Sequence, residues 1–180
     1  SVDVNKGLTI KSENGTAKCV VGASNPNDHV FYVTASRVSI TGFTIQGATG
    51  PTYAGIYLKR VNNCNITSNN VSSNRYGIYV LSSSDTAVSN NNVRNNDYGI
   101  WLRYFNNGLV TNNNASNNTN DGINLTASSN NTLTNNTAVK NDCGIYLNSS
   151  SSNNLTRNNA SSNNGYGIWL YNVNPSSDYN

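Results

Sequence analysis

Hydrophobic residues occupy alternate positions in short segments of this chain, and one such segment returns at a nearly constant interval. Each copy begins with Gly-Ile-x-Leu or Gly-Ile-x-Val, and the intervals between copies are 22, 22, 23, 22 and 23 residues. A catalytic motif does not recur six times at a fixed spacing, whereas a structural unit does. The pattern therefore predicts a repeating fold. The glycines that open the copies are Gly55, Gly77, Gly99, Gly122, Gly144 and Gly167.

Within each repeat the apolar residues follow a period of two, which is the spacing of β-strands. In the copy that starts at Gly99, Ile100 and Leu102 are expected to point inward and Trp101 outward. Further apolar residues follow along the same repeat, at Val110 and Ala115. Three short strands per repeat predict an all-β fold: a right-handed, single-stranded parallel β-helix with coils of 22–23 residues.

Two series of asparagines recur with the same spacing as the glycines. An asparagine at a turn can satisfy the backbone and also bond to its copy in the next coil. We therefore expect two ladders of asparagine side chains along the solenoid. Their members are Asn69, Asn91, Asn113, Asn136 and Asn158 in one series, and Asn74, Asn96, Asn118, Asn141 and Asn163 in the other.

The chain is expected to form one continuous domain, with irregular coils over residues 1–54 and regular coils over residues 55–180. The first 23-residue coil is expected to carry its extra residue near Asn120 and Asp121, where a turn can absorb it. Ser83 is likewise expected at a turn, where a charged replacement would cost little.

Composition and charge exclude several classes of protein. Charged residues make up 11% of the chain, and 11 basic against 8 acidic groups give a net charge of +3. The basic residues are scattered, so nucleic acid is not an expected partner. No run of about 18 apolar residues exists, so this segment is not expected to insert into a membrane. With one histidine, three cysteines and no Cys-x-x-Cys pair, we expect no metal site and no cofactor.

Several phrases of the sequence carry a resemblance to a known family: NKGLTIKSENG, HVFYVTASRVSITGFTI, NCNITSNNV and the repeated YGIYL-type units. They resemble the NosD-like and carbohydrate-binding and sugar-hydrolase (CASH) family of right-handed parallel β-helices. They look most like the Asn/Ser-rich members in archaeal surface-layer, sheath and cell-envelope proteins. The resemblance spans essentially the whole chain and implies the fold. It leaves the function open, since the family includes carbohydrate-processing enzymes, accessory proteins of copper-enzyme maturation and envelope proteins.

Enzymes of this architecture typically place several acidic residues along one face, and this chain offers one weak constellation. Asp97 and Asp142 occupy the same ladder position two coils apart, roughly 9.6 Å by the strand spacing. Asp121 lies one position off, in the coil between them. Inverting glycosidases hold two carboxyl groups about 6.5–9.5 Å apart. The alternatives are a calcium site with oxygen ligands and aspartates that replace Asn or Gly at turns.

The outward position of the Gly-Ile-x-Leu strand is aromatic in five of six repeats. An exposed aromatic row can bind a glycan, contact another subunit, or stack on itself and stiffen the sheet, and all three interpretations stay open. Lys59 and Arg103 lie two positions further along the same strands. The aromatic residues are Tyr57, Tyr79, Trp101, Tyr146 and Trp169, with Asn124 in the remaining repeat.

These features favour an extracellular cell-envelope protein with a structural or adhesive role and no catalysis of its own. Both ends look open, so copies are expected to associate end to end, and cell-surface polysaccharide is the second candidate partner. The alternatives are a carbohydrate-binding module that uses the aromatic row and a polysaccharide hydrolase or lyase that uses the three aspartates. Interchain disulfides are expected from Cys19, Cys64 and Cys143, and N-glycosylation from the sequons at Asn65, Asn130 and Asn148.

Overall fold

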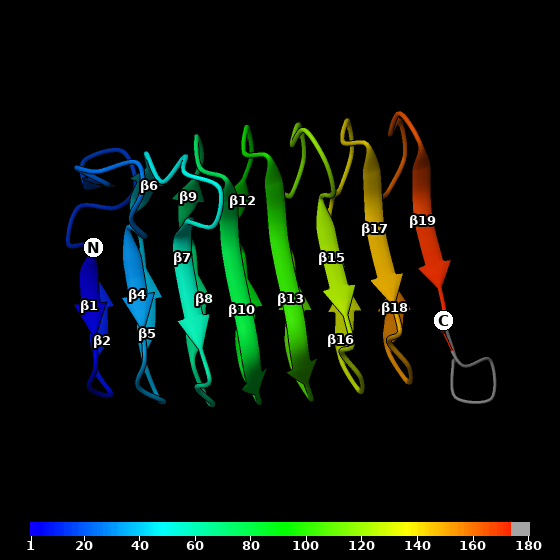
Figure 1. The fold of residues 1–180 in the computed structure, drawn as a ribbon, viewed down its shortest axis with the longest axis horizontal. Coiled ribbons are helices and arrows are strands. Elements are labelled where there is room, and N and C mark those ends of the chain that lie inside the picture. The colour runs from blue at the N-terminus through cyan, green and yellow to red at the C-terminus, as the bar shows by residue number, and fades with distance from the viewer. Residues whose placement is uncertain (174–180) are drawn as a thin grey trace.

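The computed structural model describes residues 1–173, which form a solenoid of short strands wound into stacked coils (Figure 1). The coils build three parallel sheets, so the chain is a right-handed parallel β-helix, as the repeat pattern predicts. Strands of the largest sheet lie side by side in chain order, from β1 at one end to β19 at the other. Within residues 1–173 no helix is long and apolar enough to cross a membrane.

Each sheet takes one strand from successive coils. Sheet A contains β1 (Val2–Val4), β4 (Phe31–Val33), β7 (Ala54–Lys59), β10 (Tyr76–Ser84), β13 (Tyr98–Asn106), β15 (Ile123–Thr126), β17 (Cys143–Asn148) and β19 (Tyr166–Tyr171). Sheet B contains β2 (Thr9–Lys11), β5 (Ser39–Thr41), β8 (Asn65–Thr67), β11 (Ala87–Ser89), β14 (Leu109–Thr111), β16 (Thr132–Thr134) and β18 (Asn154–Thr156). Sheet C contains β3 (Val20–Gly22), β6 (Thr44–Gln46), β9 (Asn70–Val71) and β12 (Asn92–Val93).

The third side of the solenoid is shorter than the repeat pattern predicts. After β12 the coils pair on that side through single bridges, Asn92 to Asn114 and Asn114 to Thr137. The inward residue there changes from valine, as in Val93, to alanine, as in Ala115. Alanine favours extended strand structure less than β-branched valine does, so the later coils keep the contact but not a full strand.

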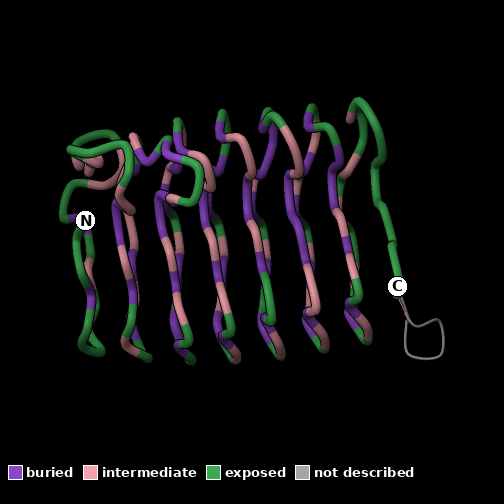
Figure 2. Tube along the Cα trace, viewed as in Figure 1, coloured by how far each residue is buried: buried purple, intermediate pink, exposed green. Residues whose placement is uncertain are grey.

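Alternate residues of each strand fill a narrow core, as the period of two predicts. Ile100 pairs with Ile78 on one side and Ile123 on the other, and all three are at most 1% exposed. Their outward neighbours are half-buried rather than buried, apart from Asn124. In Figure 2 buried segments recur in every middle coil, while β19 is exposed throughout. The core is one side chain deep, so each inward residue is buried by packing against the inward residues of the coils before and after it.

The two asparagine ladders form as predicted. In the first, the Nδ2 of Asn91 donates to the Oδ1 of Asn113 at 3.1 Å and to the backbone oxygen of Ile66 at 2.8 Å. The Oδ1 of Asn91 accepts from the backbone N–H of Asn69 at 3.0 Å. The residue before each ladder asparagine has a positive φ, such as 55° at Asn90, and this bend turns the amide inward. Each amide thus satisfies backbone groups that the corner leaves unpaired.

The repeat glycines are required by close packing between coils. A Cβ placed on Gly77 would lie 2.7 Å from the backbone oxygen of Gly99 and 3.0 Å from the amide nitrogen of Asn96. None of the six repeat glycines has a positive φ. A glycine at a corner serves either to adopt a positive φ or to let another part of the chain approach closely. The second reason applies to these six glycines.

The register shows where the first long coil takes up its extra residue. Asn96 bonds to Asn118, 22 residues later, whereas Ile100 pairs with Ile123, 23 residues later. The backbone N–H of Asn120 donates to the oxygen of Asp97 with the same offset that Asp97 has to Asn74 in the regular coil, so Asn120 is still in the 22-residue register. The backbone N–H of Gly99 donates to the oxygen of Asp121, which is already in the 23-residue register, so the extra residue falls at Asn120 and Asp121. This is the predicted position. The insertion occurs at the corner that leads into β15.

The expectation for Ser83 is wrong. Its side chain is 3% exposed, its Oγ accepts from the backbone N–H of Val61 at 3.3 Å, and it donates to the oxygen of Leu81. The positive φ of Ser82 turns Ser83 into the core at the end of the sheet A strand. A charged replacement at this position would be buried and costly.

Candidate active site

The outward face of sheet A carries a row of aromatic side chains. The parallel register places Tyr79 between Tyr57 and Trp101. The rings of Tyr57 and Tyr79 stack with centroids 5.0 Å apart, and those of Tyr146 and Trp169 lie 4.8 Å apart. Tyr32 extends the row by one coil. The repeat pattern did not predict Tyr32, because its segment HVFY does not match the Gly-Ile-x-Leu phrase. The aromatic ladder therefore consists of Tyr32, Tyr57, Tyr79, Trp101, Tyr146 and Trp169.

A second aromatic row packs against the ladder where the strands begin. Tyr76 and Tyr98 stack with centroids 5.2 Å apart, and both contact the indole of Trp101, at 5.1 and 4.8 Å. Tyr166 contacts Trp169 in the same way, at 4.8 Å. The two rows together form an extended aromatic surface over β10 and β13, in which each ring is held by several others.

The coil between Trp101 and Tyr146 interrupts both rows with polar residues. Asn124 takes the ladder position and pairs in register with Trp101 on one side and Tyr146 on the other. Asp121, two residues before Ile123, takes the position that Tyr98 holds in the preceding coil. The Nδ2 of Asn124 donates to the Oδ2 of Asp121 at 2.7 Å. We call the pair Asp121 and Asn124 the polar notch.

Asn124 is held in one orientation. The hydroxyl of Thr126 donates to its Oδ1 at 2.9 Å, which directs the amide NH₂ group toward Asp121. Asn124 is 4% exposed, so the neighbouring rows cover it. The carboxyl group of Asp121 is half-buried and lies at the edge of this cover.

The surroundings of Asp121 favour its protonated form. Burial raises the pKa of its carboxyl group above the usual 3.8, the hydrogen bond from Asn124 lowers it, and the charge of Asp142 raises it. Burial also raises the pKa of Tyr98 and of Tyr146, with a further rise from Asp121 in each case. Asp121 is therefore electrostatically coupled to the aromatic residue on each side of the notch.

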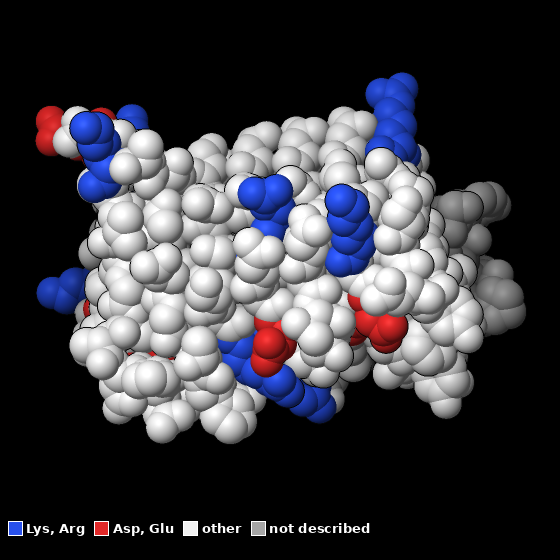
Figure 3. Space-filling view, turned by 90° about the horizontal axis from the view of Figure 1, so that it is seen from above, with Lys and Arg blue, Asp and Glu red and all other residues white. Residues whose placement is uncertain are grey.

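The three predicted aspartates do not form one group. Asp97 accepts an ion-pair hydrogen bond from the Nη1 of Arg75 at 2.6 Å, and the guanidinium of Arg75 lies over the ring of Tyr98 at 5.3 Å. Asp142 is exposed, and its charge acts on Asp121. Figure 3 shows how sparse and scattered charged side chains are on the surface where the coils turn into sheet A. Asp121 and Asp142 thus remain a candidate pair, while Asp97 is neutralised by Arg75.

Two predicted basic residues flank the ladder. Lys59 and Arg103 both pair in register with Leu81, so they lie two coils apart on the outward face. The guanidinium of Arg103 lies 5.2 Å from the ring centre of Tyr104 and lowers the pKa of Tyr79, which burial raises. These cations are available to a ligand that lies on the ladder.

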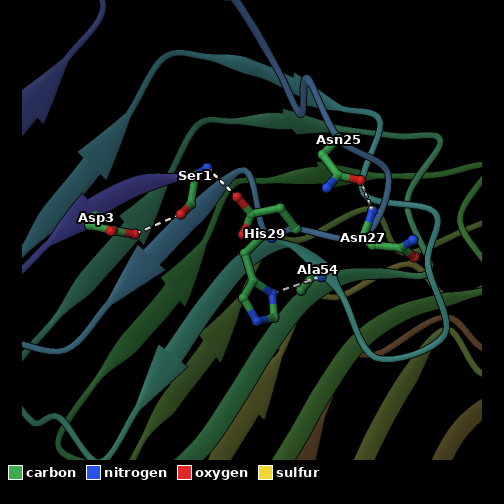
Figure 4. A network of polar contacts seen from close by, with 7 residues as sticks. Ser1, Asp3, Asn25, Asn27, His29 and Ala54 are labelled. Atoms are coloured by element: carbon green, nitrogen blue, oxygen red, sulfur yellow. Dashed lines mark hydrogen bonds and ion pairs between the residues drawn. The ribbon is translucent and has the colours of Figure 1, made fainter.

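His29 lies at the other end of the ladder, and sequence reasoning assigned it no function. Its ring lies 4.5 Å from Tyr57 and 5.1 Å from Tyr53. Its Nδ1 accepts from the backbone N–H of Ala54 at 3.0 Å, as Figure 4 shows. Burial is the main cause that lowers its pKa. The accepting Nδ1 leaves Nε2 as the protonated nitrogen of a neutral ring.

The cysteines and sequons lie away from the notch, with one exception. Cys64 and Cys143 are free and buried, and Cys19 is half-buried, which leaves Cys19 the most accessible thiol. Cys143 borders the notch, and burial, followed by the charges of Asp121 and Asp142, raises the pKa of its thiol to about 12. Asn65 and Asn130 are exposed, and Asn148 is half-buried. Interchain disulfides and glycosylation stay predictions.

The family of the chain follows from its sequence. A family model described as periplasmic copper-binding protein (NosD) matches residues 2–150 and 38–179. The chain belongs to the NosD family. A periplasmic family agrees with the predicted location in the cell envelope. No curated protein sequence matches the chain significantly.

Several solved structures share the fold of this NosD-family chain. The Azotobacter vinelandii mannuronan C-5 epimerase AlgE6 A-module has a TM-score of 0.71 at 15% identity over 78% of this chain and 40% of its own. The periplasmic alginate epimerase AlgG has a TM-score of 0.71 at 24% identity, over 84% and 37%. The DFA-IIIase from Arthrobacter chlorophenolicus A6, in complex with GF2, has a TM-score of 0.74 at 14% identity, over 88% and 43%. The chain thus spans less than half the length of these structures.

These likenesses correct the prediction of a structural protein without catalysis. The three structures are named as a mannuronan C-5 epimerase, an alginate epimerase and a DFA-IIIase, and none of the three is named as an envelope structural protein. Identities of 14–24% show the shared fold alone. That prediction counts the small number of acidic residues in the chain against an enzyme. End-to-end association of copies stays a prediction.

The described residues of this NosD-family chain do not fit a copper site. Copper in proteins is bound by imidazole nitrogen and by cysteine or methionine sulfur. The sequence has one histidine and no methionine, and the thiols of Cys64 and Cys143 point at backbone oxygens of Ala35 and Ile145. In residues 1–173 no three His, Cys, Asp or Glu side chains are grouped so that they could hold a metal ion. No step of the proposed function involves copper.

Proposed function

We propose that this domain is a carbohydrate-modifying enzyme that binds a polysaccharide along the aromatic ladder and hydrolyses it at the polar notch. The observation that carries the proposal is the single interruption of the aromatic ladder between Trp101 and Tyr146, where Asn124 takes the place of a ladder ring and Asp121 takes the position that Tyr98 holds in the preceding coil. Aromatic rings bind the apolar C–H faces of sugars, and a break between two platforms leaves room for chemistry on the bond that spans it.

Asp121 is suited to the role of general acid. Burial raises the pKa of its carboxyl group, and this direction of shift favours the protonated form, which can donate a proton to the oxygen of the leaving sugar. Asn124 orients the carboxyl group through the 2.7 Å hydrogen bond. Asp142, exposed beside it, is the candidate base that takes a proton from the attacking water. One water is consumed for each glycosidic bond, and the two carboxyl groups exchange their protonation states.

The ladder residues bind and position the polymer. Trp101 is buttressed by Tyr76 and Tyr98, so its indole face is held in place before a ligand arrives. Binding to a preformed surface costs less conformational entropy than ordering mobile side chains. Trp101 on one side of the notch and Tyr146 on the other would hold the sugars on both sides of the bond that is cleaved.

The test is the release of reducing ends from a panel of neutral and acidic polysaccharides. The wild-type domain is expected to cleave at least one of them, and Asp121→Asn is expected to lower the rate by about 10²- to 10⁴-fold because it removes the acid. Asp85→Asn is the matched control, because Asp85 is exposed at the far end of the sheet A strand. The control should keep the wild-type rate.

Two results would contradict the proposal. One is a wild-type domain that releases no reducing ends from any polymer of the panel. The other is an Asp121→Asn variant that cleaves as fast as the wild type. Circular dichroism of each variant shows whether the β-helix is intact, so that a loss of activity is not a loss of fold.

A further inference from the structure

We infer that the polymer bound on the aromatic ladder is a linear polyuronate, which lies along the solenoid axis with carboxylates against Lys59 and Arg103. The inference rests on the proposed function for the place of binding. It adds the chemical class of the substrate and the direction in which it lies, and it can be tested by binding alone.

The spacing of the ladder fits an extended chain that runs across the strands. Successive coils are about 4.8 Å apart, which is close to the length of one sugar residue in an extended polysaccharide. Tyr57, Tyr79 and Trp101 lie in three successive coils. A chain that runs along the axis therefore meets one ladder ring per sugar over these coils, whereas a chain that runs along β13 would meet Trp101 and, from the second row, Tyr98.

The cations follow the same axis at twice this spacing. Lys59 and Arg103 both pair with Leu81, so they are two coils apart, about 9.6 Å by the strand spacing. A polyuronate presents a carboxylate on every sugar, and every second one would come next to one of these two residues. The flank of the ladder matches a repeating anion better than a neutral polymer.

Both cations lack an acidic partner in the described chain. Within residues 1–173 the ion pairs are Arg75 with Asp97 and the amino group of Ser1 with Asp28. The charge of Lys59 lowers the pKa of His29, so its field reaches the ladder. Arg60 likewise lowers the pKa of Tyr57, which burial raises to about 12. The positive charge beside the rings is thus left for a ligand to neutralise.

The acidic groups near this face are arranged so that they do not repel an anion strongly. Asp97 is neutralised by Arg75 at 2.6 Å. Asp121 is hydrogen-bonded to Asn124, and its surroundings favour the protonated form. Asp3 of β1 pairs in register with Tyr32 of β4, so it lies outside the stretch of sheet A from Lys59 to the notch. Asp142 is the exposed acid beside the notch, and it is also the group that the reaction uses as a base.

The experiment measures binding of the inactive Asp121→Asn chain to polygalacturonate and alginate, and to the same polymers after reduction of their carboxyl groups to alcohols. Affinity electrophoresis or calorimetry gives the dissociation constants. We expect at least one polyuronate to bind about tenfold more tightly than its reduced form, as charge-assisted hydrogen bonds require. The difference should shrink with added salt.

Two variants locate the effect. Arg103→Gln should weaken polyuronate binding about tenfold and leave binding of the reduced polymer unchanged. Arg157→Gln is the matched control, because Arg157 is exposed at a corner after β18, away from sheet A. The control should bind both polymers like its parent.

The outcomes separate this inference from the proposed function. Equal binding of the acidic and reduced polymers overturns the inference, and so does an Arg103→Gln variant that binds polyuronate like its parent. If the wild type then releases reducing ends from a neutral polymer, the proposed hydrolysis stands without the polyuronate. If polyuronate binds in the expected way but is never cleaved, the inference stands and the hydrolysis does not.

Discussion

At the scale of single residues, the notch combines a carboxyl group with an amide in place of two aromatic rings. Asp121 is half-buried against rings that cannot solvate its charge, and Asn124 donates the one hydrogen bond that partly offsets this cost. Such a group destabilises the folded protein when it ionises. Functional sites commonly carry this kind of cost, because a perturbed carboxyl group is what proton transfer requires.

The stability of the Asp121→Asn variant tests this account. Because the folded pKa of Asp121 is raised above 3.8, the folded state holds the proton more tightly, and stability falls as the pH rises from 3.8 through the folded pKa. Asn mimics the neutral form, so the variant should be more stable than the wild type at neutral pH and lose that gain below pH 3.8.

Thermal or denaturant unfolding at the two pH values measures the difference. Asp85→Asn, at an exposed corner, should change the free energy of unfolding by less than about 0.5 kcal/mol at neutral pH. If Asp121→Asn is less stable than the wild type at neutral pH, the fold stabilises the carboxylate of Asp121, contrary to the structure described.

At the scale of elements, the corners of each coil are held by side-chain amides. The Oδ1 of Asn113 accepts from the backbone N–H of Asn91 at 3.0 Å, and its Nδ2 donates to the backbone oxygen of Val88 at 2.8 Å. The same Nδ2 also donates to Asn136 at 3.0 Å. One amide therefore satisfies two buried backbone groups and links three coils, which explains why the spacing of asparagine is so regular.

The Asn113→Ala variant measures the contribution of one ladder position. It leaves the N–H of Asn91 and the oxygen of Val88 without these partners, so it should lower the free energy of unfolding by about 3 kcal/mol. Asn112→Gly is the matched control, since Asn112 is exposed with a φ of 54° that glycine adopts freely. Equal stability of the two variants in urea unfolding would count against the ladder as a source of stability.

At the scale of the whole molecule, each coil contacts only the coils before and after it. The strands β10 and β13 each have a strand on both sides, whereas β19 pairs with β17 alone among the described strands and is exposed at all six positions. Stability in such a stack is a sum of coil and neighbour terms. The aromatic ladder runs along the same axis, so each coil from β4 onward, except at the notch, contributes one residue to the ladder and its own inward residues to the core.

Hydrogen exchange should follow this order along the axis. Backbone amides of β10 and β13 are expected to exchange most slowly, and those of the two end strands, β1 and β19, to exchange fastest among the sheet A strands, because opening an end strand disrupts one interface rather than two. Mass spectrometry of the exchanged protein gives the protection of each strand. Equal protection of β19 and β13 would mean that the stack opens only as a whole.

The sequence by itself determined the coil length, the inward residues, both asparagine ladders and most of the aromatic ladder. Each depends on spacing alone: a period of two sets the face of a strand residue, and a constant interval brings copies into register. The same reasoning found Asp121 beside the first of the two 23-residue intervals. It also placed Asn124 as the one ladder position without a ring.

Only the tertiary structure decided which of these residues act together. Asp121 reaches Asn124, Asp97 is bound by Arg75, and Ser83 turns into the core. These outcomes depend on corner bends with positive φ and on a one-residue shift in register, which change the direction of a side chain without changing the hydrophobic pattern. The burial of Asp121 depends on residues in other coils, and this burial raises the pKa of its carboxyl group. No local stretch of sequence encodes that effect.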